Sequence, residues 1–298
     1  MAILALDIGA TKFAAGLVDE AGRVGAVHRV PVPDHDVWEV CGGLLREVAA
    51  GAPVTAVGIG SAGPVDVPAG ITRALNIPQW RDGFAIVAAV GSLFPHATVR
   101  FALDGACLAL AEHHSGALRG LRNGLAMTVS SGIGGGILVD GRVSMGRTGN
   151  AGHIGHLVVP GWDVPCACGG FGCLEAVASG MSSARWARTQ GWTGDTGAEL
   201  ASDARAGDAI AVAALERAGT ALGTAIGSAA ALLDVDTVVV GGGFAASGEL
   251  LWAPLRAAAA RHSGLGFIRE LRVERSGLAE GATLCGAAIL AAGLPAVS

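Results

Sequence analysis

Residues 149–180 read GNAGHIGHLVVPGWDVPCACGGFGCLEAVASG. Three of the six cysteines of the chain, Cys166, Cys168 and Cys173, fall within eight residues, and His156 precedes the first of them by ten. Three thiols and one imidazole form a donor set that suits tetrahedral zinc, and four protein ligands leave no open position on the metal. The stretch therefore predicts a structural zinc site. Three buried or oxidisable cysteines in a glycine-rich loop are the alternative.

Two polar residues of this stretch are not required by a zinc site. His153 precedes His156 by three residues, and Glu175 follows Cys173 by two. A loop that is folded tightly around a metal holds its neighbouring side chains in fixed positions. We therefore expect His153 and Glu175 of the same loop to bind a polar ligand.

The composition indicates a globular protein with a large buried core. Of the residues, 51% are hydrophobic and 15% are charged. The length of 298 residues is enough for one large domain or two ordinary ones. We find no uncharged run of 18 strongly apolar residues, so no membrane span is expected. The first residues, MAILALDIG, lack the basic start of a signal peptide.

The net charge and the cysteine content indicate which partners and which cellular compartment we expect for this protein. The formal net charge is −5, which gives no general attraction to nucleic acid. Six cysteines in a chain of this length, three of them clustered, favour a metal over a disulfide framework. We therefore expect a cytoplasmic protein.

The first strands of the chain enclose a turn with the only lysine. Residues 2–8 and 13–19 have the pattern of strands, with AG at 21–22 as the next turn, and Lys12 lies between the two strands. The turn is not a Walker A loop, because the chain has no G-x4-G-K-[ST] string. A compact ammonium suits some phosphate sites better than a guanidinium, so Lys12 is a candidate phosphate contact.

The remainder of the first half alternates between helical and strand patterns, which is typical of an α/β layer. Residues 37–50 predict an amphipathic helix, residues 54–60 a strand, and residues 99–112 a short strand followed by a helix. Asp104 stands at the start of that helix, where an N-cap is the ordinary reading. Asn76, in LNIPQW, is by itself equally well explained as a turn residue.

The second half contains two glycine clusters. Residues 125–141 predict a β-hairpin with SSGIGGG at its tip, where backbone amides can bind anionic oxygens. A buried strand at 235–244 runs into three glycines. An ordinary hairpin and a strand-to-helix turn are the alternatives. A long helix with small residues, an edge strand at 269–276 and a last helix at 282–294 complete the pattern.

The sequence resembles the ROK family of repressors, open reading frames and kinases. The resemblance is carried by GNAGHIGH followed by CACGGFGCLE, and is supported by the order of the other motifs. It implies an α/β, two-domain actin-like ATPase (ribonuclease H-like) fold with an active-site cleft between the domains. We expect domains at 1–103 and 104–281, with the helix at 282–298 packing back on the first.

The resemblance implies transfer of a phosphoryl group from ATP, bound with Mg2+, to the 6-hydroxyl of a hexose or amino-hexose. The first phosphate loop differs from the family pattern in having Ala10 where a second glycine is usual. Asp104 is implied as the catalytic base. The implied sugar contacts are Gly63, Asn76, Asp104, His153, His156 and Glu175. The implied ATP contacts are Asp7, Gly9, Thr11, Lys12, Ser130, Ser131, Gly132, Gly134, Gly241, Gly242 and Gly243. The implied Zn2+ ligands are His156, Cys166, Cys168 and Cys173.

Three departures from the family pattern bear on the sugar. Leu103 and Ala106 replace two asparagines, and His153 stands where many glucose-acting members carry glutamate. We therefore expect altered contacts with the groups at C3 and C4 of the sugar. Such contacts favour kanosamine, glucosamine or an N-acetylated hexosamine such as N-acetylmannosamine. A sugar-binding sensor without catalysis is the alternative.

The expected partners are the sugar, ATP and a second copy of the chain, because family members are often dimers. The apolar helices at 210–233 and 282–294 are candidates for the dimer contact, although core packing explains them equally well. The acidic chain begins at the phosphate-loop strand, so a DNA-binding regulator is not expected. A single lysine disfavours polyphosphate as the donor.

Overall fold

The computed structural model describes residues 2–19, 22–278 and 281–293. The chain divides into two compact units, unit 1 with residues 1–115, 141–152 and 279–298, and unit 2 with 116–140 and 153–278. Helix Asp104–Ser115 and residues 141–152 therefore belong to unit 1. Position 21 of the predicted turn at 21–22, and the predicted helical residues 294–298, lie outside the described residues.

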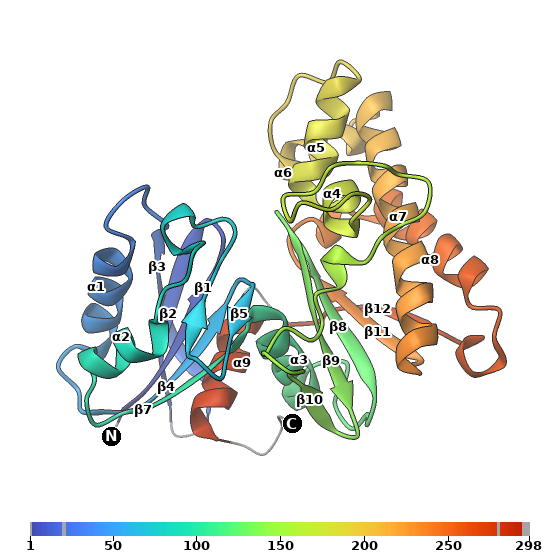
Figure 1. Ribbon diagram of the computed structural model, residues 1–298. Helices are drawn as coiled ribbons and strands as arrows, with labels where there is room; N and C mark the ends of the chain where they lie inside the picture. Colours follow the sequence, from blue (N-terminus) through green and yellow to red (C-terminus); the bar gives the residue numbers. More distant parts are fainter. Residues whose placement is uncertain (1, 20–21, 279–280, 294–298) are drawn as a thin grey trace. The chain divides into compact units, whose positions relative to one another are not determined.

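A five-stranded sheet with the order β3-β2-β1-β4-β7 forms the centre of unit 1. β1 pairs antiparallel with β2 and parallel with β4, which pairs parallel with β7. In Figure 1, α1 covers one face of this sheet and α9 the other. The elements are β1 (Ala2–Ile8), β2 (Lys12–Val18), β3 (Val24–Pro31), α1 (Val37–Ala49), β4 (Val54–Ser61), β5 (Val65–Asp66), β6 (Ile71–Thr72), η1 (Pro78–Trp80), α2 (Ile86–Leu93), β7 (Thr98–Leu103), α3 (Asp104–Ser115) and α9 (Ala282–Ala292).

Glycines allow α9 to lie directly against its neighbours in unit 1. A methyl group on Gly58 of β4 would stand 1.9 Å from the Ala287 carbonyl oxygen. A methyl group on Gly286 would stand 1.8 Å from the Cys107 carbonyl oxygen on α3. Side chains cannot occupy these positions without moving a backbone, so the glycines fix α9 against the parallel strands.

Unit 2 is built on a second sheet, in which its strands have the order β9-β8-β11-β12. β8 and β9 form the predicted hairpin, and β12 is the predicted edge strand, paired in parallel with β11. The elements of unit 2 are β8 (Gly124–Val129), β9 (Ile133–Val139), η2 (Ile154–His156), α4 (Leu174–Ala178), α5 (Gly180–Thr189), α6 (Gly197–Arg205), α7 (Ala209–Leu233), β11 (Thr237–Gly241), η3 (Ala245–Ser247), α8 (Glu249–His262), η4 (Gly266–Ile268) and β12 (Arg272–Arg275), whereas β10 (Arg142–Ser144) lies among the residues of unit 1.

The long helix α7 has the character of a core helix. Among the described residues it is the one helix long and apolar enough to cross a membrane, but 56% of its most apolar window is buried. Gly219 and Gly223 face α8 so closely that added methyl groups would lie 2.3 Å from the Leu251 oxygen and 2.1 Å from the Leu255 oxygen. This confirms the prediction of one long helix with small residues for close packing.

We expect Gly223→Ala to lower stability by about 1–3 kcal/mol, because the new methyl group must push α8 away. Gly43→Ala is the matched control. Gly43 also lies in a helix, α1, but an added methyl group meets nothing within 4 Å, so alanine should stabilise by about 0.5–1 kcal/mol. Thermal unfolding followed by circular dichroism should shift in opposite directions for the two variants. Equal shifts would refute this account of the α7–α8 contact.

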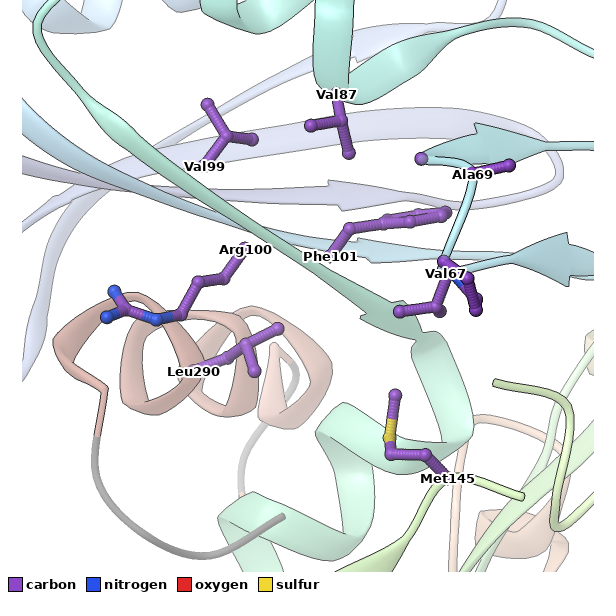
Figure 2. A pocket seen from close by; sticks show the side chains of 10 residues that line it. Val67, Ala69, Val87, Val99, Arg100, Phe101, Met145 and Leu290 are labelled. Atoms are coloured by element: carbon purple, nitrogen blue, oxygen red, sulfur yellow. The ribbon is translucent and has the colours of Figure 1, made fainter. Parts of the chain in front are cut away.

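Unit 1 also contains a hollow of about 410 Å³ beside β7. Its walls include Val87, Phe101 and Leu290, and no predicted site residue lines it. Figure 2 shows the Arg100 guanidinium turned along α9, where it donates to the Ala291 carbonyl oxygen at 2.6 Å. The hollow is therefore apolar and separate from the candidate site.

Candidate active site

In unit 1 the carboxyl ends of three parallel strands are level with one another. Ile8 of β1 is opposite Ser61 of β4, which is opposite Leu103 of β7. Asp7 lies one residue before the end of β1, and Asp104 follows β7 directly. Ligands of open parallel sheets bind outside the carboxyl ends of the strands, so these two carboxylates lie at the edge where a ligand is expected.

Asp7 has an unusual acidity. Burial, followed by the negative charge of Asp104, raises the pKa of Asp7 from 3.8 to about 7, while Lys12 and Arg29 act in the opposite direction. The side chain is half-buried. Two carboxylates that oppose each other's ionisation form a site that a cation stabilises. A divalent cation that accompanies a nucleotide would meet this requirement.

The turn between β1 and β2 presents two side chains to solvent. Gly9 N–H donates to the Lys12 carbonyl oxygen at 3.0 Å, which closes the turn. Val32, the residue after β3, donates its N–H to the Thr11 carbonyl oxygen at 3.0 Å and holds the turn. Thr11 and Lys12 are both exposed. The turn therefore offers a hydroxyl and an ammonium group close to the Asp7 carboxylate.

Asp104 is the first residue of α3. Its Oδ1 accepts a hydrogen bond from the Gly105 N–H at 2.7 Å, and the side chain is half-buried. The positive end of the helix dipole favours an ionised carboxylate there. Leu103 and Ala106, which replace the two asparagines of the family pattern, are each 1% exposed. These two side chains therefore contribute packing and not polar contacts.

Asn76 lies in a tight turn beside the loop of Gly63. Leu75 N–H donates to the Gly63 oxygen at 3.2 Å, and Ile77 N–H donates to the Ala74 oxygen at 3.0 Å. Trp80 anchors this segment and is 2% exposed. Its ring stacks on Phe84 with centroids 4.7 Å apart. The prediction of a turn at Asn76 is confirmed, and the turn is tied to the loop of Gly63 through the neighbouring residue Leu75.

In unit 2 the two glycine clusters lie together. β8 and β11 are parallel neighbours, and Gly241 is opposite Thr128. Phe244 N–H donates to the Val129 oxygen at 3.0 Å. Gly242 has a φ of 98°, and a methyl group on it would stand 2.6 Å from the Val129 oxygen. Backbone therefore packs on backbone between the strand-end glycines and the start of the hairpin loop 130–134.

The predicted zinc ligands converge. Cys166 Sγ lies 3.8 Å from His156 Nδ1, and Cys168 Sγ lies 3.7 Å from Cys173 Sγ. All four donor atoms lie within 4.8 Å of one another. Zinc–sulfur bonds of about 2.3 Å in a tetrahedron separate the sulfur atoms by about 3.8 Å, so the donor atoms have the spacing that zinc requires.

Backbone hydrogen bonds shape this loop. Cys166 N–H donates to the Gly170 oxygen at 2.8 Å, and Gly169 N–H donates to the Cys166 oxygen at 3.0 Å. Gly169 and Gly172 have φ values of 90° and 71°, in the left-handed region that favours glycine. The glycines between the thiols thus permit the tight fold that the sequence predicts.

His153 and Glu175 lie on different sides of the metal cluster in the sequence. The rings of His153 and His156 have centroids 5.7 Å apart. Burial, then the proximity of His156, lowers the pKa of His153. Glu175 Oε2 accepts a hydrogen bond from Ile133 N–H at 2.8 Å. This contact with the hairpin loop is not foreseen by the sequence, because the two residues are 42 positions apart.

A model of the ROK family matches residues 3–293. The chain belongs to the ROK family. A glucokinase from Thermotoga maritima is 32% identical over 96% of each chain. A kanosamine kinase from Amycolatopsis mediterranei is 34% identical over 82% of this chain and 80% of its own length.

The crystal structure of a ROK family glucokinase from Streptomyces griseus in complex with glucose and AMPPNP is also similar. It has a TM-score of 0.86 and 31% identity, over 98% of this chain and 100% of that chain. The predicted actin-like ATPase fold is confirmed by this likeness together with the two α/β units.

The candidate residues of this ROK protein fall into two groups. Unit 1 carries Asp7, Gly9, Thr11, Lys12, Gly63, Asn76 and Asp104. Unit 2 carries Ser130, Ser131, Gly132, Gly134, His153, His156, Cys166, Cys168, Cys173, Glu175, Gly241, Gly242 and Gly243. Each group forms a local constellation within its own unit.

A further contact supports the zinc loop from α7. The Arg217 guanidinium lies 5.8 Å from the ring centroid of Trp162 and 5.4 Å from that of Trp186. Arg217 also donates to the Val177 oxygen at the end of α4. The sequence gives no signal for this residue, because its partners come from three separate segments.

Proposed function

We propose that this ROK protein is an ATP-dependent kinase that phosphorylates the 6-hydroxyl of a hexose or amino-hexose. The observation that carries the proposal is the pair Asp7 and Asp104 at the level carboxyl ends of β1 and β7. One carboxylate would hold the cation that accompanies a nucleotide, and the other would accept a proton. A binding protein without catalysis needs neither.

Asp104 is the base of the proposed reaction. Its carboxylate accepts the proton of the sugar 6-hydroxyl as the oxygen attacks the γ-phosphorus of ATP. The bond between the γ-phosphorus and the β–γ bridging oxygen breaks, and ADP leaves with that electron pair. In phosphoryl transfer the proton moves late, and positioning and charge neutralisation carry most of the catalysis.

The phosphates would be held by the two glycine-rich loops. Thr11 and Lys12 supply a hydroxyl and a charge from unit 1, and backbone amides of residues 130–134 supply donors from unit 2. Gly241, Gly242 and Gly243 would let the nucleotide approach the backbone. Asp7 would orient Mg2+ that arrives with ATP.

The sugar would be gripped by Gly63, Asn76, His153, His156 and Glu175. His156 and the three cysteines would hold zinc, which would crosslink this loop. His156 can then present its other ring nitrogen to a sugar hydroxyl. The relatives named glucokinase and kanosamine kinase act on glucose-like rings, which supports a hexose with variation at C3.

The experiment is an ADP-release assay with Mg-ATP against glucose, glucosamine, N-acetylglucosamine, N-acetylmannosamine, mannose and kanosamine. One strongly preferred sugar is expected. Sugar binding without turnover for every member of the panel would support the sensor alternative.

Light scattering tests the expected homodimer, and replacing ATP by polyphosphate tests the identity of the phosphoryl donor. Cytoplasmic localisation is part of the proposal, since zinc–thiolate ligation requires reduced cysteines.

We expect His153→Glu to raise kcat/KM for glucose relative to the preferred amino sugar by about tenfold. The substitution restores an acceptor for a sugar hydroxyl, and an unmet hydroxyl in a closed site costs about 1–3 kcal/mol. Competition between the two sugars in one assay measures the ratio directly. An unchanged ratio would show that His153 does not select the sugar.

A further inference from the structure

The hairpin loop at residues 130–133 is held from outside by the metal-bearing segment. Glu175 Oε2 accepts from Ile133 N–H at 2.8 Å. Gly180 N–H donates to the Ser130 carbonyl oxygen at 2.8 Å. The loop also closes on itself, since Ser130 N–H donates to the Gly132 oxygen at 2.9 Å. Both ends of the loop are therefore tied to one short stretch of chain.

The hairpin loop and the segment with the metal ligands pack so closely that their glycines cannot carry side chains. A methyl group on Gly132 would stand 2.5 Å from Glu175 Oε2, and one on Gly155 would stand 2.2 Å from the Ile133 oxygen. Real side chains do not tolerate such distances. Gly155 and Glu175 thus both lie directly against the loop, and a methyl group on Gly155 would also stand 3.4 Å from the Glu175 Cβ.

These two holding residues stand next to metal ligands. Gly155 directly precedes His156, and Glu175 follows Cys173 by two residues in the first turn of α4. Leu174 N–H donates to the Leu157 oxygen at 2.9 Å, which joins the two ligand-bearing strands of chain. A change in the positions of His156 and Cys173 would therefore carry Gly155 and Glu175 with it.

We infer that Glu175 is a positioning residue for the second phosphate loop, and that metal occupancy of the cysteine cluster sets nucleotide affinity even in the absence of sugar. The inference rests on the proposed binding of nucleotide by loop 130–134. It gives the zinc loop a second task, because the same segment that faces the sugar also holds the loop that faces the phosphates.

The test measures AMPPNP affinity by calorimetry without sugar, for the zinc-loaded protein and two variants. Glu175→Ala removes the acceptor and should weaken AMPPNP binding at least tenfold. Glu175→Gln keeps an acceptor oxygen for Ile133 N–H and should bind AMPPNP as the wild type does. Both variants should lose sugar affinity. Glu216→Ala, an exposed glutamate on α7 in the same unit, is the control and should change nothing.

A second measurement does not depend on the variants folding. Removal of zinc by a chelator should weaken AMPPNP binding at least tenfold, and added zinc should restore it. Hydrogen exchange of the peptide around Ile133 should speed up in the zinc-free protein. Equal AMPPNP affinity with and without zinc, with unchanged exchange, would overturn the inference. Failure of the zinc-loaded wild type to bind AMPPNP would instead overturn the proposed function.

Discussion

Asp104→Asn should lower kcat by about 10²–10⁴-fold and leave the fold intact. General base catalysis contributes a factor of that size. The asparagine amide oxygen can still accept from Gly105 N–H, as Asp104 Oδ1 does at 2.7 Å. It can also accept a hydrogen bond from a sugar hydroxyl, but it cannot take the proton. We therefore expect the loss in kcat and only small changes in the KM for ATP.

The control for this prediction is Asp36→Asn. Asp36 is exposed in the same unit and has a φ of 56°, a conformation that asparagine accepts. Its kcat should equal that of the wild type, and the thermal unfolding of both variants should show whether the fold is retained. A folded Asp104→Asn protein with kcat within tenfold of the wild type would exclude Asp104 as the base.

Local patterns predicted many of the longer elements. Alternation and helical periodicity give β1, the β8–β9 hairpin, α1 and α7, because each depends on neighbours within one turn or one hairpin. No local pattern predicted β3, α2, β5, β6, β10, α4 or α8. β3 has mostly exposed side chains, and β5 and β6 have only two residues each, so the apolar patterns of these three strands are weak or too short to detect.

The candidate residues could be recognised from the sequence, but their contacts with one another and with distant segments could not. The spacing of His156 and the cysteines predicts the cluster that the structure contains. The Glu175–Ile133 hydrogen bond and the stacking of Trp80 on Phe84 depend on the packing of separate segments. The raised pKa of Asp7 also depends on such packing, because its causes are burial and the charge of Asp104. Tertiary packing sets such contacts, and a single sequence does not encode them in any local pattern.

Asp7→Asn should stabilise the ligand-free protein at pH 8 while it lowers phosphoryl transfer. Burial and Asp104 raise the pKa of Asp7 from 3.8 to about 7, so the folded state holds the proton more tightly than the unfolded state does. The stability that this proton supplies is complete below pH 4 and is lost as the pH rises toward 7. A shift of about three units corresponds to at most about 4 kcal/mol, less whatever water screens in the half-buried site.

Asparagine imitates the neutral carboxyl and removes this pH dependence. The gain in melting temperature of Asp7→Asn over the wild type should therefore be near zero at pH 4, grow up to pH 7 and remain constant above it. Because the Asp104 charge contributes to the raised pKa, the gain should be smaller when both proteins also carry Asp104→Asn. A gain that is the same at pH 4 and pH 8 would show that the ionisation of Asp7 is not opposed in the fold. Without an opposed pair of carboxylates, the proposed cation site at the ends of β1 and β7 would lose its physical basis.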